Sequence, residues 1–258
     1  MKAVFKNYWF FLLLLFISNS LLAQNSFDLL KKELDQTLAD EPLYLNKKNS
    51  VINQLKSNLR FSVSNEIRYS LYEKLYDEYK SYQSDSALVY AKRSLNIAYK
   101  NQNNSQISKA QLNLASILGT LGMYNQALEI LDPMDSKVVS ALKGEFYWTK
   151  RIIYGGLSGY ANGKEEKIKY SQLGAKYRDK AIAHLSTNSI EFIIASSVQL
   201  FAQKKYPKAI NLLTPHFEKI PKTDPNRAVI AYLISENYKV KQDKEQEKKW
   251  LAISAISD

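Results

Sequence analysis

The stretch from Ser108 to Met134, SKAQLNLASILGTLGMYNQALEILDPM, decides the fold of this chain. Apolar residues recur every three or four positions on both sides of Gly122, which is the pattern of two amphipathic helices joined by a turn. Gly122 stands where the first helix must stop, because glycine adopts a positive φ without steric cost. The residues expected to pack the two helices together are Leu114, Ala115, Leu118, Gly122, Tyr124, Ala127 and Leu131.

This order of residue types resembles the tetratricopeptide repeat, a helix–turn–helix unit that recurs along a chain. The pattern returns at Tyr206, Ala209 and Leu213, and more loosely around Ala87. Ala87 and Ala127 are 40 residues apart, and Ala127 and Ala209 are 82 apart, about twice that interval. We therefore expect an all-α, tetratricopeptide-like helical-hairpin solenoid with N-terminal helices. An irregular helical bundle is the alternative.

The repeats are expected over residues 64–258, as at least four antiparallel helix pairs stacked with a right-handed superhelical twist. Residues 24–63 are expected to form an N-terminal helical segment made of two helices. The first has an apolar stripe at Phe27, Leu30, Leu34 and Leu38, with Ser26 as its N-cap and Pro42 as its end. The second carries Leu45, Ile52, Leu55 and Leu59.

Further start and stop signals divide the repeat region. A helix is expected to begin after Ser64, Asn188 and Ser189 can cap the helix from Ile190, and Asp224 and Pro225 mark another helix start. The glycine-rich segment 155–163 is expected to be the turn between a helix over 146–154 and one over 165–182.

Composition excludes several classes of protein. The 258 residues include no Cys, which excludes disulfides, thiolate metal sites and cysteine nucleophiles. Two His leave little for a histidine metal site, and eight Gly with six Pro are few for an all-β fold with many tight turns. We expect no metal and no cofactor.

Residues 1–23 are typical of a secretory signal peptide. Lys2 and Lys6 precede the apolar run Trp9–Ile17, and Ala23 provides a small residue for cleavage. The run is shorter than the roughly 20 residues that a membrane span needs, and no later segment is apolar enough to span. We expect an exported, periplasmic protein without a transmembrane span after cleavage; an uncleaved anchor is the alternative. The net charge of +11 does not by itself indicate nucleic acid, which an exported protein rarely meets.

The segment from Ile67 to Tyr82, followed by Asp85 to Ala91, resembles an uncharacterised family of tetratricopeptide proteins of the Bacteroidota. The resemblance covers residues 27–258, including the tail from Trp250 to Asp258. It implies an exported repeat half, followed in the family by one transmembrane helix, a cytoplasmic coiled coil and a helix-turn-helix DNA-binding segment. The sequence ends at Asp258, before those parts.

No motif predicts catalysis. Residues 156–160 resemble a nucleophile elbow but have Tyr160 where glycine is needed, and residues 159–164 depart from the phosphate-loop spacing. We interpret both as parts of a repeat turn. His184 and His216 lack partners at metal-ligand spacing. We therefore predict no catalytic, cofactor-binding or metal-ligating residues.

The leading hypothesis is a non-enzymatic scaffold that binds a protein or peptide in the concave groove of the solenoid, which the first helix of each pair lines. The candidate groove residues are Lys109, Leu112, Ser116, Thr120, Ile194, Val198 and Phe201. The carboxylate-clamp pattern of chaperone-binding repeats is not evident. The alternatives are a sensory input module of an envelope signalling and transcription-regulation system, implied by the family resemblance, and an outer-membrane carbohydrate-uptake accessory protein.

Two further surfaces have open interpretations. The tyrosines at 69, 72, 76, 79 and 82 follow helical spacing, which favours packing over a binding surface. The last helix carries Trp250, Leu251, Ile253 and Ile256 on more than one side, which predicts docking of another subunit or protein. The alternative is that Trp250 packs under the last helix pair.

Overall fold

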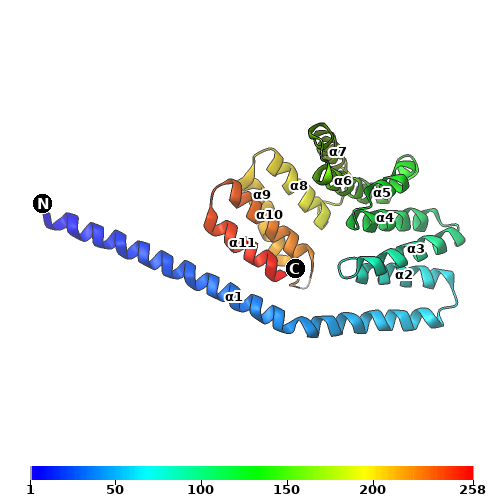
Figure 1. The fold of residues 1–258 in the computed structure, drawn as a ribbon, viewed down its shortest axis with the longest axis horizontal. Coiled ribbons are helices and arrows are strands. Elements are labelled where there is room, and N and C mark those ends of the chain that lie inside the picture. The colour runs from blue at the N-terminus through cyan, green and yellow to red at the C-terminus, as the bar shows by residue number, and fades with distance from the viewer. Residues whose placement is uncertain (1, 223, 258) are drawn as a thin grey trace. The chain divides into compact units, whose positions relative to one another are not determined.

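The computed structural model describes residues 2–222 and 224–257, with side chains from Asp28 onward. Over these residues the chain is all-α, as predicted (Figure 1). Its helices are α1 (Lys2–Phe61), α2 (Asn65–Tyr79), α3 (Ser84–Lys100), α4 (Asn104–Thr120), α5 (Tyr124–Leu131), α6 (Lys143–Tyr160), α7 (Lys164–Ile182), α8 (Ile190–Ala202), α9 (Tyr206–Lys219), α10 (Asn226–Val240) and α11 (Lys244–Ser257). Two short 3-10 helices, η1 (Asp132–Met134) and η2 (Ser140–Leu142), connect α5 to α6.

From α2 onward the described helices form five hairpins: α2–α3, α4–α5, α6–α7, α8–α9 and α10–α11. Three of the hairpin turns have the same geometry, with a positive φ two residues before the second helix. The residues are Gly122 (φ 76°), Lys204 (φ 59°) and Gln242 (φ 61°). In each turn the following N–H donates to a carbonyl five residues back, at 2.8, 2.9 and 3.1 Å respectively. This closure satisfies carbonyls at the end of the first helix and confirms the prediction for Gly122.

Ala87, Ala127 and Ala209 occupy equivalent positions, which confirms the repeat. Each is the fourth residue of its helix, in α3, α5 and α9. Each is fully buried, and each backbone N–H donates to the carbonyl of the residue before the helix, at 3.0–3.1 Å. A methyl side chain at this point lets the second helix of a hairpin approach its neighbours closely.

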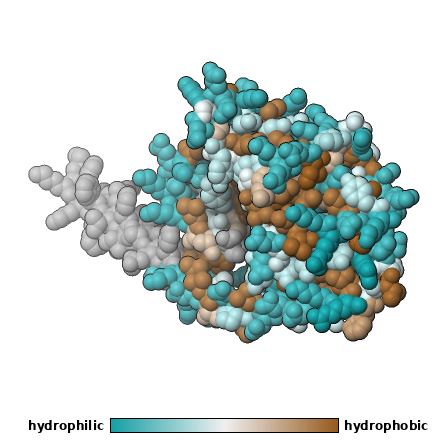
Figure 2. Space-filling view, turned by 45° about the vertical axis from the view of Figure 1, so that its right-hand side comes forward, coloured by the Kyte–Doolittle hydropathy of each residue, from teal (hydrophilic) through white to brown (hydrophobic). Residues whose placement is uncertain are grey.

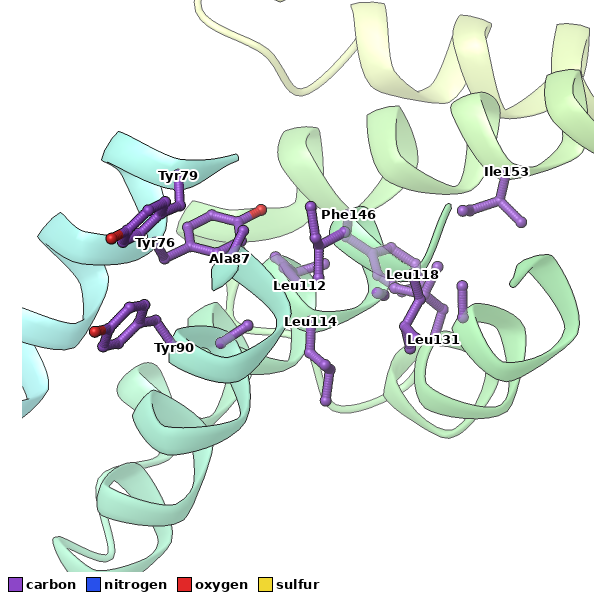
Figure 3. Close-up of a cluster of buried hydrophobic side chains, with 14 of the residues drawn as sticks. Tyr76, Tyr79, Ala87, Tyr90, Leu112, Leu114, Leu118, Leu131, Phe146 and Ile153 are labelled. Carbon is purple, nitrogen blue, oxygen red and sulfur yellow. The ribbon is translucent and has the colours of Figure 1, made fainter. Parts of the chain in front are cut away.

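The chain divides into two compact units, one from Leu45 to Leu213 and one made of residues up to Tyr44 together with Thr214–Asp258. In the first unit, consecutive hairpins share one core (Figure 3). Its fully buried members include Leu75, Leu112, Leu131, Phe146 and Ile153. Ile52 of α1 is also part of this core, and Leu55 and Leu59 pack against it.

In the second unit, α10 and α11 pack along each other. Ile230, Ala231 and Ile234 of α10 are fully buried. Ser254 Oγ of α11 donates to the carbonyl of Ala228 at 2.9 Å, which ties the two helices together.

The helix starts were predicted well. Ser64 Oγ accepts from the N–H of Ile67, and Ser189 Oγ accepts from that of Phe192 at 3.2 Å. Asp224 Oδ1 accepts from the N–H of Asn226 at 2.9 Å, so the aspartate caps the start of α10.

Two predicted helix ends were wrong. Ser26 and Pro42 lie inside α1, which is continuous to Phe61. Proline removes one backbone donor and disfavours a helical conformation for the residue before it. The backbone hydrogen bonds of α1 before and after Pro42 nevertheless persist. Before the proline, Thr37 Oγ1 also donates to the carbonyl of Glu33 at 2.9 Å. Of the predicted turn 155–163, only residues 161–163 lie outside helices.

One glycine of this segment, Gly156, has a packing role instead. A Cβ on Gly156 would lie 2.4 Å from Cε1 of Tyr124, so this glycine lets α6 pass against the tyrosine ring. A close approach therefore explains a glycine that resembles a turn residue in the sequence.

The predicted signal peptide, residues 1–23, and Phe27 lie outside the residues whose side chains are described. Of the helices in the described part of the chain, none combines the length and the apolarity needed to cross a bilayer.

Figure 2 shows one face of the molecule, where hydrophobic patches alternate with hydrophilic side chains.

Candidate functional site

The first helices of three consecutive hairpins place polar side chains next to one another. They are Tyr69 and Glu73 of α2, Lys109 and Asn113 of α4, and Glu145 of α6, and we call these five residues the polar ladder. Within α2 and within α4 the two residues are four apart, so they share one face of their helix.

Direct bonds join the ladder across the hairpins. Asn113 Nδ2 donates to Glu73 Oε2 at 2.8 Å, which links residues 40 apart. Lys109 Nζ lies 2.6 Å from Glu145 Oε1, which links residues 36 apart. Tyr69 donates its hydroxyl to the carbonyl of Gln106 at 3.3 Å. Side chains from three repeats thus form one continuous polar strip.

Glu73 is the most enclosed charge of the ladder. Ser94 Oγ of α3 donates to Glu73 Oε1, so both carboxylate oxygens accept a hydrogen bond. Burial raises the pKa of Glu73, while the bonds from Ser94 and Asn113 and the charge of Lys109 oppose that rise. Fixed donors therefore hold a carboxylate that solvent reaches only partly.

Two tyrosines border this carboxylate. Burial, together with the charge of Glu73, raises the pKa of Tyr69. Burial is also the largest cause that raises the pKa of Tyr76, and a hydrogen bond with Ser116 opposes it. Both phenols therefore stay protonated at neutral pH and act as hydrogen-bond donors.

The predicted groove residues divide into two groups. Lys109 belongs to the ladder, Ser116 and Val198 are partly exposed, and Thr120 is exposed with its hydroxyl on the carbonyl of Ser116 at 3.3 Å. Phe201 is partly exposed and packs edge-on against Tyr206, with ring centroids 5.4 Å apart.

Leu112 and Ile194 were wrongly placed on the groove. They are 1% and 8% exposed, and Leu112 belongs to the buried core. One residue corresponds to about 100° around a helix, so Asn113 faces Glu73 where Leu112 faces the core. Sequence reasoning also missed Glu73 and Glu145; the only local signal was the four-residue spacing of Lys109 and Asn113.

The predicted repeat-packing residues lie where the repeat requires them. Leu114, Ala115, Leu118, Ala127, Leu131, Ala209 and Leu213 are buried. Tyr124 and Tyr206 are partly exposed at the starts of α5 and α9, and Gly122 lies in the turn before α5.

The tyrosine series is mainly packing, as the helical spacing favoured. Tyr76 and Tyr79 are buried, and Tyr79 stacks on Tyr90 of α3 with centroids 5.6 Å apart. Tyr69 and Tyr72 are partly exposed, and Tyr82 is 37% exposed.

The segments considered for catalysis have local structural partners. Ser158 Oγ donates to the carbonyl of Lys167 at 3.1 Å, which joins α6 to α7. His184 Nδ1 lies 2.9 Å from the carbonyl of Lys180, and its ring meets Tyr147 edge-on. Among the described residues, no group of three or more His, Asp or Glu side chains could hold a metal ion.

At the last helix, Trp250 meets Phe217 edge-on with ring centroids 5.0 Å apart. The tryptophan therefore packs under the last hairpin, which is the alternative that the sequence left open. Leu251 is 40% exposed, and Ile253 and Ile256 are partly exposed. Self-association through α11 stays a prediction.

Comparisons with known proteins support this helical-repeat architecture. A family model described as the SusR N-terminal TPR domain matches residues 38–258. Among solved structures, a thermophilic TPR protein of Thermus thermophilus superposes with a TM-score of 0.53 at 18% identity, covering 72% of this chain and 88% of that chain. That likeness shows the fold alone. No curated protein matches the chain. The tetratricopeptide resemblance predicted from the sequence is confirmed.

Proposed function

The chain belongs to the family of SusR N-terminal TPR domains, and from this premise we propose that it is an exported, non-enzymatic scaffold that binds a protein or peptide along its polar ladder. Helical-repeat folds of this class generally mediate interactions between proteins, because stacked hairpins present an extended surface. The ladder supplies the directional groups that such a surface needs for specificity.

The bonds across the ladder are the observation that carries this proposal. Polar side chains 36 and 40 residues apart converge from three hairpins. Their contribution to folding is small where they are exposed: the Lys109 and Glu145 side chains are 38% and 36% accessible, and surface pairs of this kind contribute about 0–1 kcal/mol. The aligned charges therefore suit recognition better than stability.

Unused hydrogen-bonding capacity supports the same proposal. The Lys109 ammonium has three donors, and the Glu145 carboxylate, which is 36% accessible, keeps Oε2 after Oε1 pairs with Lys109. A peptide backbone offers alternating N–H and C=O groups, so donors and acceptors on one strip can hold it in a defined register.

Site-specific photo-cross-linking tests the proposal. A photoreactive residue at Thr120 or Ser116, beside the ladder, should cross-link to one defined partner in the organism's own envelope fraction. The same residue at exposed Glu129, on the second helix of that hairpin, is the matched control. Lys109→Ala should reduce the Thr120 cross-link several-fold, and Lys137→Ala should leave it unchanged. Equal cross-linking from Glu129, or no effect of Lys109→Ala, would contradict binding along the ladder.

Export is the second part of the proposal, and it rests on the charged and apolar pattern of residues 1–23. Intact-mass measurement of the protein recovered from the periplasmic fraction should give a chain that begins at Gln24. A chain of full mass in the membrane fraction would support the uncleaved anchor instead.

A further inference from the structure

We propose that Arg151, held over the ring of Trp148, forms a binding site for a carboxylate group of a peptide ligand. The inference rests on the proposed function, because it names a chemical group that the scaffold recognises. Both residues lie on α6 in the Leu45–Leu213 unit, outside the polar ladder.

Arg151 is a cation without a counter-charge. Its guanidinium lies over the Trp148 ring, 5.1 Å from the centroid. It makes no hydrogen bond or ion pair with any residue that the structure describes. The charge that acts on it is that of Arg178, which has the same sign. Burial, and then the charge of Arg178, lower the pKa of Arg151 from its ordinary value.

Asp179, which directly follows Arg178 in the sequence, already pairs with that arginine. Its Oδ1 accepts from Arg178 Nε at 3.0 Å and Nη2 at 2.8 Å, and from Gln199 Nε2 of α8 at 3.1 Å. Asp179 thus fixes the Arg178 side chain, which is 12% accessible, and ties α7 to α8. The carboxylate leaves Arg151 unpaired.

The neighbouring Lys150 shows how this fold neutralises a buried cation that has only a structural role. Lys150 Nζ lies 2.9 Å from Asp132 Oδ1, 3.9 Å from Asp135 Oδ2 and 3.5 Å from the Tyr177 hydroxyl. Its side chain is 3% accessible. Two acids thus neutralise the buried ammonium, as is usual for buried charges. The adjacent Arg151 has none.

Solvent still reaches the unpaired guanidinium. Among the buried side-chain nitrogen and oxygen atoms of the described residues, only Asn237 Oδ1 lacks a partner, so the nitrogens of Arg151 are not sealed off. A partly desolvated cation that remains accessible attracts an anion more strongly than a fully hydrated one.

The planar shape of the Arg151 guanidinium favours a carboxylate as its ligand. The planar guanidinium offers paired N–H donors that match the two oxygens of a carboxylate. Trp148 holds that plane from one side, and exposed Ile152 on α6 provides an apolar neighbour for the rest of the ligand. In a peptide the carboxylate comes from the chain end or from an Asp or Glu side chain.

Binding of short peptides to the full chain tests this site at constant ionic strength. The probes are N-acetyl-Gly-Gly with a free carboxylate, N-acetyl-Glu-amide, and N-acetyl-Gly-Gly-amide as the uncharged control. Tryptophan fluorescence should respond to a carboxylate probe and not to the amide, and Trp148→Phe should abolish the response. Comparing the first two probes distinguishes a chain end from an acidic side chain.

Variants of Arg151 separate the contribution of its charge to carboxylate binding from that of the paired N–H donors of its guanidinium. Arg151→Gln should weaken carboxylate binding at least tenfold, and Arg151→Lys should restore only part of it. The matched control is Arg93→Gln, because exposed Arg93 also lies over a tyrosine ring, at 5.5 Å from the Tyr90 centroid, and should leave binding unchanged.

Three results would overturn the inference: equal response to the carboxylate and amide probes, equal loss in the Arg93 and Arg151 variants, or carboxylate binding that Arg151→Gln leaves intact. The cross-link from Thr120 reports on the proposed function separately. If Arg151→Gln leaves carboxylate binding intact while that cross-link persists, the carboxylate site fails and the scaffold function stands.

Discussion

At the scale of single residues, the unusual feature of this protein is how differently it treats its buried charges. Lys150 is neutralised by two aspartates, Glu73 is held by two neutral donors, and Arg151 has an aromatic ring and a like charge. Burial penalises a charge unless bonds or counter-charges offset the lost hydration. The degree of compensation therefore distinguishes cations and anions that serve the core from those that a ligand can reach.

Glu73 makes a prediction about pH. Its pKa is raised in the folded chain, so the folded state holds the proton at a pH where the unfolded state has released it. The contribution of Glu73 to stability is therefore complete below the ordinary glutamate pKa and is lost as pH rises through the folded value. Thermal melts of the wild type and of Glu73→Gln between pH 4 and 7 should show the wild type losing stability relative to the variant as pH rises.

The control for this experiment is Glu129→Gln, an exposed glutamate of α5. Its stability relative to the wild type should stay constant over the same pH range. A difference between wild type and Glu73→Gln that does not change with pH would show that folding does not raise the pKa of Glu73, because the bonds from Ser94 and Asn113 and the charge of Lys109 offset its burial.

At the scale of the element, the hairpin is the unit that the sequence specifies, because its signals are local. A serine cap, a turn with positive φ and an alanine at the fourth helical position all lie within about 30 residues of one another. Ala127, Gly122 and Ser189 were predicted in these roles and occupy them. The roles of Pro42 and Gly156 were not predicted. Pro42 is tolerated because α1 continues on both sides of it, and Gly156 is needed because α6 passes close to the ring of Tyr124, which is distant in sequence.

The close crossing at Ala127 predicts intolerance of a larger side chain. Ala127 is fully buried among Leu118, Leu131 and other core residues. Ala127→Leu should lower the free energy of unfolding by about 1–3 kcal/mol, because overpacking forces neighbouring side chains and backbone to shift. Denaturant unfolding measures the change. Ala141→Leu, at an exposed position, is the matched substitution and should have little effect; equal effects would show that the crossing is loose.

The shared turn geometry predicts opposite effects of glycine at two equivalent positions. A Cβ at Gly122 would meet no atom within 4 Å, so Gly122→Ala tests the backbone alone. It should destabilise by about 1–2 kcal/mol, the usual cost of a left-handed conformation for a residue with a Cβ. Lys204, at φ 59°, already bears that strain, and Lys204→Gly should be neutral or stabilising in chemical denaturation. Destabilisation by both changes would mean that the two turns are not equivalent.

At the scale of the whole molecule, the sequence predicts the kind of architecture better than it predicts the surface. A repeat interval read from Ala87, Ala127 and Ala209 is enough to expect a helical solenoid. The bonds from Glu73 to Asn113 and from Lys109 to Glu145 join different repeats, and no periodic signal reports which polar residue of one hairpin meets which of another. The candidate site depended on those long-range pairings, so only Lys109 of its five residues was predicted.

Repeat architecture also predicts how a local defect spreads. Each hairpin contacts mainly its neighbours, so stability is close to a sum of local terms, and α10 and α11 belong to a different compact unit from α2–α6. Ile234 of α10 is fully buried, and Ile234→Ala should cost about 2–5 kcal/mol through the cavity it leaves. Hydrogen exchange should accelerate for amides of α10 and α11 and stay unchanged for those of α2–α6. Val229→Ala, at a position 43% exposed on the same helix, is the control and should change neither set. Equal acceleration throughout the chain would mean that the two units unfold as a single cooperative body, since a loss confined to α10 then lowers the stability of every helix alike.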